Sequence, residues 1–145
     1  MTSTESNPPR VVVGYDGSAS SNKALELAAR QAELTGAILE VVTAWEWPTT
    51  YGAPLSLPEG FDPASDAKTV VDEAGRLVRE AHPAVQTKLL VKEGHPAPIL
   101  VEASKGASLL VVGSRGHGAF VGMVLGSVSE HCVTNAECPV LVFRH

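Results

Sequence analysis

The sequence has few cysteines that could form stabilising disulfides and no long apolar run that could anchor it in a membrane. Its 145 residues hold two cysteines, Cys132 and Cys138, too few for a disulfide framework and at a spacing that zinc sites do not use. No run approaches the roughly 18 consecutive apolar residues that span a bilayer, and residues 1–9 lack the apolar core of a signal peptide. We expect buried cysteines and a cytoplasmic protein, with residues 10–145 forming one domain after a flexible tail of residues 1–9.

Basic residues are also few. The sequence contains 11 Lys and Arg residues and 16 Asp and Glu residues, which gives a formal net charge of −5. The basic residues are scattered along the chain, whereas nucleic-acid binding relies on clustered cations that displace counterions. The composition therefore argues against a nucleic-acid or anionic-membrane partner. Any phosphate site has to rely on backbone amides more than on cationic side chains.

Three common motifs are missing as well. No glycine-rich segment ends in the lysine and Ser/Thr pair of a P-loop, and "GYDGSASS" lacks the glycine spacing of a dinucleotide-binding turn. A receiver domain needs an acidic pair after its first strand and an aspartate after its third. The chain offers Asp16 alone and then "KEG" at those places, so these three classes do not fit.

What the sequence does have is a regular alternation of short apolar runs and helical patterns. The runs predict strands, and apolar residues at spacings of three and four predict the helices between them. This order is typical of the α/β class, here a single doubly wound five-stranded parallel sheet with helices on both faces. The strands are predicted at 10–15, 37–44, 85–91, 108–113 and 138–143, the helices at about 21–35, 67–81, 96–104 and 127–135, and a long loop at 45–63.

The segment "GSRGHGAFVGMVLGS", residues 113–127, holds five glycines and follows the apolar run 109–112. In doubly wound sheets ligands bind beyond the carboxyl ends of the strands, which is where this segment lies. Gly113, Gly116 and Gly126 can take a positive φ or let another backbone approach closely. Ser127 and Glu130 form a capping-box pattern, so a helix is predicted to begin there with its first amides open to an anion.

These residues alone support phosphate binding and a plain chain turn equally. A helix terminus contributes only about 0.3–1 kcal/mol to anion binding when exposed, whereas micromolar affinity requires roughly 8 kcal/mol. A nucleotide site here would therefore need a pocket for the base and a metal ion in addition to the amides.

The spacing of Gly113, Gly116, Gly126 and Ser127 resembles the nucleotide-binding motif of the universal stress protein family. The stretches "VVVGYDGSASSNKAL", "AILEVVTAW" and "HCVTNAECPVLVFR" resemble the family's opening strand, second strand and closing helix and strand. The resemblance covers nearly the whole chain. It implies an adenine nucleotide alpha hydrolase-like, Rossmann-like fold and membership of the ATP-binding subfamily.

The resemblance implies a set of binding residues, assigned by their positions in the family's motifs. Asp16 would contact the nucleoside beside Gly14, where many archaeal relatives have proline, and the backbone of Ala44 would bind adenine. Roles that involve no ligand remain open for three of these residues: Asp16 in an Asx-type turn, Arg115 as a solvated cation and His117 as a surface residue. The phosphates would be held by Gly113, Gly116, Gly126, Ser127 and the Val128 amide, in a loop also lined by Ser114, Arg115, His117 and Gly118.

The function that follows from the resemblance is an ATP-binding stress-response protein, a nucleotide-dependent sensor or adaptor that binds ATP with Mg²⁺. No catalytic residues are predicted, because no general base accompanies Asp16 and Arg115, so the chain would be at most a slow ATPase. Dimers would form by pairing of the last strand, residues 138–143, which would also cover an exposed sheet edge. A nucleotide-free dimeric interaction module and a cyclic AMP binder remain the alternatives.

Overall fold

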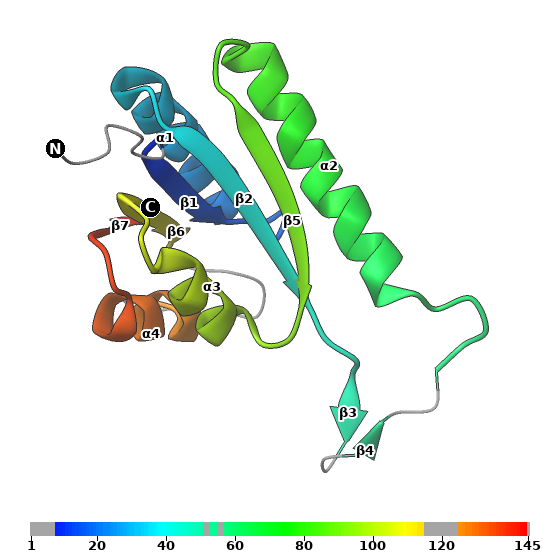
Figure 1. Cartoon of the computed structure of the whole chain (residues 1–145). Helices are drawn as coiled ribbons and strands as arrows, with labels where there is room; N and C mark the ends of the chain where they lie inside the picture. Colours follow the sequence, from blue (N-terminus) through cyan, green and yellow to red (C-terminus); the bar gives the residue numbers. More distant parts are fainter. Residues whose placement is uncertain (1–7, 51–52, 55–56, 115–124, 145) are drawn as a thin grey trace, which may run out of the picture.

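The computed structural model describes residues 8–50, 53–54, 57–114 and 125–144. Its main sheet has five parallel strands in the order β5-β2-β1-β6-β7 (Figure 1). The predicted doubly wound α/β class is confirmed, with β1 at the centre of the sheet. The strands are β1 (Arg10–Gly14), β2 (Ile38–Trp45), β5 (Thr87–Glu93), β6 (Leu109–Gly113) and β7 (Val140–Phe143).

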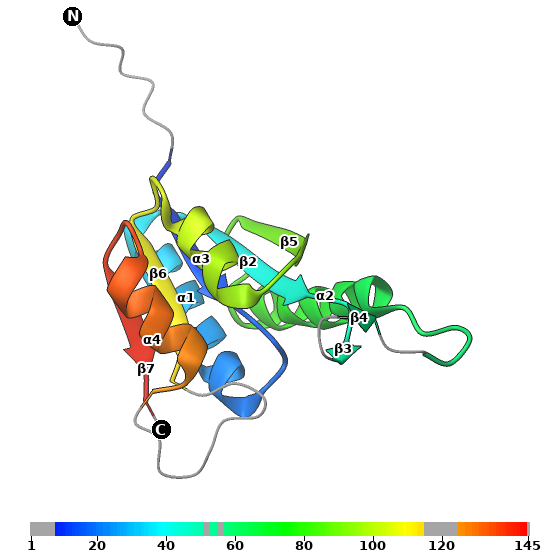
Figure 2. The ribbon, with the colours of Figure 1, turned by 90° about the horizontal axis from the view of Figure 1, so that it is seen from below.

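Two helices cover each face of this sheet (Figures 1 and 2). The longer pair, α1 (Ala19–Thr35) and α2 (Pro63–Ala81), packs on one face, and the shorter pair, α3 (Pro96–Ser104) and α4 (Ser127–Asn135), packs on the other. Each face has its own apolar cluster. Val11, Val13 and Leu39 belong to the first cluster, and Val12, Leu110 and Cys132 belong to the second.

Local chemistry explains where α1 and α2 begin and end. The Ser18 hydroxyl accepts a hydrogen bond from the Ser21 amide at the start of α1, and Gly36 ends this helix in the left-handed conformation at φ 69°. At the start of α2 the Asp62 carboxylate accepts from the Ser65 amide, and a proline occupies the first turn. The predicted apolar stripe of α2 faces the sheet.

The segment predicted as a long loop contains a small antiparallel ribbon, β3 (Thr49–Thr50) paired with β4 (Ala53–Pro54). The many turn residues concealed this ladder, because two residues per strand give no readable alternation. In the same segment the Trp47 ring lies 5.7 Å from the Trp45 ring and 6.4 Å from the Phe61 ring. The aromatic residues thus pack on one another within the connection between β2 and α2.

Both cysteines are free, and Cys132 is fully buried. Burial raises the pKa of its thiol to about 11, which keeps it protonated and unreactive at neutral pH. The apolar role predicted for it is confirmed. None of the described helices is long and apolar enough to cross a bilayer.

Candidate functional site

Strands β1 and β6 lie side by side at the centre of the sheet, paired at Val13 and Val111. The chain leaves β1 toward α1 on one face and leaves β6 toward α4 on the other face (Figure 2). This divergence marks a topological switch point at the carboxyl ends of the two strands, the place where doubly wound proteins bind ligands. The candidate site is built around it.

The turn after β1 is held by its own polar groups. The Asp16 carboxylate accepts a hydrogen bond from the Ser18 amide at 2.9 Å, and Gly17 adopts a positive φ of 82°. The Asp16 amide donates to the Ser21 hydroxyl at 3.3 Å. The Asx-type turn considered for Asp16 does form, and its carboxylate is still exposed at the carboxyl edge of the sheet.

The two glycines that end these strands are explained by close packing on opposite faces. A Cβ at Gly113 would lie 3.0 Å from the backbone carbon of Ser20 at the start of α1, and closer still to the Ser20 hydroxyl. A Cβ at Gly14 would lie 2.8 Å from a methyl group of Leu100 on α3. Packing alone therefore accounts for both glycines, and a ligand is not needed to explain them.

The peptide groups of Ala44 face the space beyond the end of β1. The ladder between β1 and β2 ends at the pair Gly14 and Val42, and the Val42 carbonyl accepts from the Tyr15 amide at 2.9 Å. Alternate residues of a strand direct their peptide groups to the same side. Ala44, two residues after Val42, consequently presents its N–H and C=O past the last residue of β1.

At the end of β6, Ser114 joins three elements. Its amide donates to the carbonyl of Phe143 in β7, and its carbonyl accepts from the Gly126 amide and the Ser129 hydroxyl at the start of α4. Ser114 is 2% exposed. Ser114 and Gly126, which flank the glycine segment, are therefore joined by a hydrogen bond, whereas Arg115, Gly116, His117 and Gly118 lie outside the described residues.

The start of α4 differs from the predicted capping box. The helix begins at Ser127 as expected, but its N-cap is Gly126, which has an ordinary φ of −72° and no side chain to cap the helix. Glu130 instead donates its amide to the Gly126 carbonyl as an ordinary helical residue. Within the described part of the chain, the first amides of α4, including those of Ser127 and Val128, thus have neither an intrahelical acceptor nor a capping side chain.

The comparisons with known proteins agree with this geometry. The family model described as "Universal stress protein family" matches residues 8–144. The chain belongs to the universal stress protein family. It is 36% identical over 146 residues to a universal stress protein of Mycobacterium tuberculosis strain H37Rv, covering 94% of this chain and 45% of that relative. It is 34% identical over 134 residues to one from Mycolicibacterium smegmatis, covering 92% of this chain and 45% of that protein.

Among solved structures, a universal stress protein crystallised in complex with cAMP has a TM-score of 0.71 and 29% sequence identity. That match covers 95% of this chain and 98% of the other. The chain thus spans the full length of a solved family member but about 45% of the length of the curated relatives it matches.

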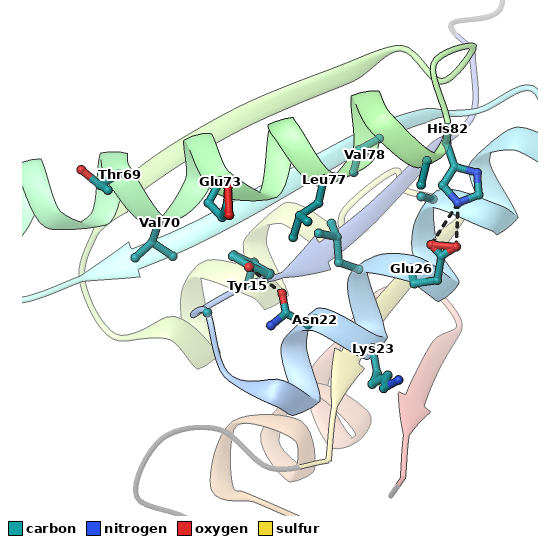
Figure 3. A pocket seen from close by; sticks show the side chains of 14 residues that line it. Tyr15, Asn22, Lys23, Glu26, Thr69, Val70, Glu73, Leu77, Val78 and His82 are labelled. Atoms are coloured by element: carbon teal, nitrogen blue, oxygen red, sulfur yellow. Dashed lines mark hydrogen bonds and ion pairs between the residues drawn. The ribbon is translucent and has the colours of Figure 1, made fainter.

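A groove lies between α1 and α2 (Figure 3). This interhelical groove has a volume of about 750 Å³, and Leu25, Ala29 and Val78 line it together with Tyr15 and Gly17 from the turn after β1. The Tyr15 hydroxyl donates to the Asn22 side-chain oxygen at 2.6 Å. Burial, with smaller effects of Glu73 and Asp16, raises the pKa of Tyr15 and keeps it a neutral donor.

The groove ends at a histidine to which the sequence patterns gave no role. His82 lies beside a proline at the end of a predicted helix, yet its side chain is buried between α1 and α2 and contacts Glu26 and Glu33. The two glutamates are seven residues apart, so they share one helical face. That spacing was the signal that could have indicated a cationic partner for α1.

Proposed function

We propose that this chain binds an adenine nucleotide beyond the carboxyl ends of β1 and β6 and acts as a nucleotide-dependent sensor or adaptor in the stress response. The observation that carries the proposal is the N-terminus of α4, which no side chain caps. This terminus lies next to the hydrogen bond between Gly126 and Ser114, the two residues that flank the glycine segment. Open helix N-terminal amides favour anions. The related protein in complex with cAMP supports an adenine nucleotide as the ligand class.

Each part of the nucleotide has a candidate partner at this edge of the sheet. The outward peptide groups of Ala44 fit the hydrogen-bonding edge of a purine, and the Asp16 carboxylate, beside Gly14, fits a ribose hydroxyl. Both backbone groups of Ser114 are engaged, so this residue positions the loop. The phosphates would meet the amides of Gly113, Gly116, Gly126, Ser127 and Val128, with Arg115, His117 and Gly118 in the same loop.

ATP with Mg²⁺ is the proposed form of the ligand. Within the described part of the chain no three His, Cys, Asp or Glu side chains are grouped to hold a metal. The ion would therefore be held mainly by the phosphates, with Asp16 as the carboxylate at this edge, and would neutralise phosphate charge. Asp16 already accepts from the Ser18 amide, which fits a positioning role and at most slow hydrolysis.

Cyclic AMP is the second candidate, because the related solved structure holds it. Titration calorimetry on nucleotide-stripped protein with ATP and Mg²⁺, ADP and cyclic AMP separates the two. We expect binding of ATP with Mg²⁺, and we expect Gly116→Asp to abolish it without lowering the melting temperature. Thr134→Asp adds the same charge at an exposed position near the other end of α4 and should bind like the wild type. No heat with any nucleotide would favour an interaction module instead.

We further propose a homodimer through residues 138–143. β7 is an edge strand, and an unpaired edge invites pairing with a second chain. The carbonyls of Pro139 and Phe143 accept bonds from the β6 side, so the peptide groups of Val140 and Val142 point outward. Proline at Val142 removes an outward donor and spares the β6 ladder.

Light scattering after gel filtration tests the dimer. We expect the wild type to elute as a dimer and Val142→Pro as a folded monomer. Leu141→Pro is the matched contrast: Leu141 directs its amide toward β6, so this variant should lower stability itself. A Val142→Pro variant that remained dimeric would place the interface elsewhere.

A further inference from the structure

His82 joins the two long helices at the end of the interhelical groove (Figure 3). It is the C-cap residue of α2, where its amide donates to the Val78 carbonyl at 2.7 Å. The residue is 8% exposed, and its imidazole reaches across to α1. The glutamates are 49 and 56 residues from His82 in the sequence, so this contact is tertiary.

Both ring nitrogens face carboxylates. Nε2 lies 2.8 and 3.0 Å from the two carboxylate oxygens of Glu26, and Nδ1 lies 3.2 Å from an oxygen of Glu33. An ionised carboxylate only accepts hydrogen bonds, so both nitrogens have to carry a proton to satisfy this geometry. The neutral ring has one bare lone pair, which would be directed at an oxygen of one glutamate. The arrangement therefore fits the imidazolium form.

We propose that His82 is a proton-dependent latch, which ties the C-terminal end of α2 to Glu26 and Glu33 of α1 when protonated and releases one of them when neutral. Release removes one of the two carboxylate contacts of His82, so the last turn of α2 opens more readily. The groove between α1 and α2 then loosens from its His82 end. The latch requires no ligand and is independent of the proposed nucleotide site.

The other charged side chains around His82 do not change the preference for its imidazolium form. On α1, Arg30 lies one turn from each glutamate, and on α2 the nearest charged side chains are Arg79 and Glu80, while residues 83–86 are uncharged. Hydrogen bonding to Glu26, with a smaller effect of Glu33, raises the pKa of His82 above its ordinary value, although burial opposes this. Both glutamate side chains are 45% exposed, so solvent moderates the interaction.

The sign of the pH effect follows from the raised pKa of His82. The folded state holds the proton more tightly than the unfolded chain, whose histidines titrate near about 6.5. The latch therefore contributes its full stabilisation below that pH and loses it as the pH rises through the folded pKa. Stability attributable to His82 should fall as the pH rises above about 6.5.

His95 provides a matched control within the same chain. The Nδ1 atom of His95 lies 3.0 Å from a carboxylate oxygen of Glu46, and this contact also joins two distant parts of the sequence. The His95 side chain, however, is 64% exposed and faces one carboxylate. The two histidines differ in burial and in the number of carboxylates around the ring. Substitution of each by asparagine removes the titrating group without adding charge.

The test follows thermal unfolding of wild type, His82→Asn and His95→Asn from pH 5.5 to 9. We expect the melting temperature of His82→Asn to lie below that of the wild type at pH 5.5, by a margin that shrinks as the pH rises. His95→Asn should show no such pH-dependent margin. A His82→Asn margin that is constant across this range would overturn the latch.

Titration of the wild-type His82 ring protons by NMR gives a second measurement that needs no variant of His82. The folded pKa should lie above 6.5 and should fall in Glu33→Gln, which keeps a hydrogen-bonding side chain but removes one negative charge. The His82 amide should exchange with solvent faster, after correction for intrinsic rates, once the ring is neutral. A ring that titrates at or below 6.5 would contradict the proposal.

Discussion

The two faces of the sheet are built differently. Helices α1 and α2 have 17 and 19 residues, and a side chain caps the N-terminus of each. Helices α3 and α4 have nine residues each, and neither has a capping side-chain hydrogen bond. One face thus caps its helix starts with side chains, whereas the other face does not. Prolines occupy the first turn of α3, so the backbone donors of the proposed phosphate site come from α4 alone.

The neighbouring glycines Gly113 and Gly14 show the same contrast in their packing. Gly113 abuts the backbone at the start of α1, which is fixed by the Ser18 cap. Gly14 abuts the end of the Leu100 side chain on α3, which can change its rotamer. We expect Gly113→Ala to lower the free energy of unfolding by about 3 kcal/mol, toward the upper end for overpacking.

Gly14→Ala is the matched variant and should cost about 1 kcal/mol, the scale of a shifted rotamer. Urea unfolding of the two variants measures the difference, with an unchanged m-value as the sign that the folded state is preserved. Equal losses at the two positions would mean that α1 yields as easily as the Leu100 side chain. The distinction between a rigid and an adaptable face would then be wrong.

Much of this fold could be predicted because its elements repeat a simple pattern. The apolar runs around Val12 and Val111 are buried on both sides, and the apolar stripe of α2 is long enough to be read without ambiguity. Gly36 ended the first helix as predicted. The pairing of Thr49 with Pro54 was missed, because a ladder this short leaves no periodic pattern.

The site was less predictable, because its geometry depends on contacts between distant segments. The choice of Gly126 over Ser127 as the N-cap is tied to the bond from the Gly126 amide to Ser114, which no local pattern encodes. Sequence could not separate a ligand role for Gly113 from packing against Ser20. His82 and its glutamates likewise come together only through the packing of α1 on α2.

The capping contrast between the faces can be sharpened with two serine variants. The Ser18 hydroxyl caps α1 by accepting from the Ser21 amide at 3.2 Å, so Ser18→Ala should lower the free energy of unfolding by about 1 kcal/mol. Ser127 is exposed in the first turn of α4, where no side chain caps the helix, so Ser127→Ala should change stability by less than about 0.5 kcal/mol. Urea unfolding gives both values. A larger stability loss for Ser127→Ala than for Ser18→Ala would show that the Ser127 hydroxyl caps α4. The open anion site at the start of this helix would then not exist.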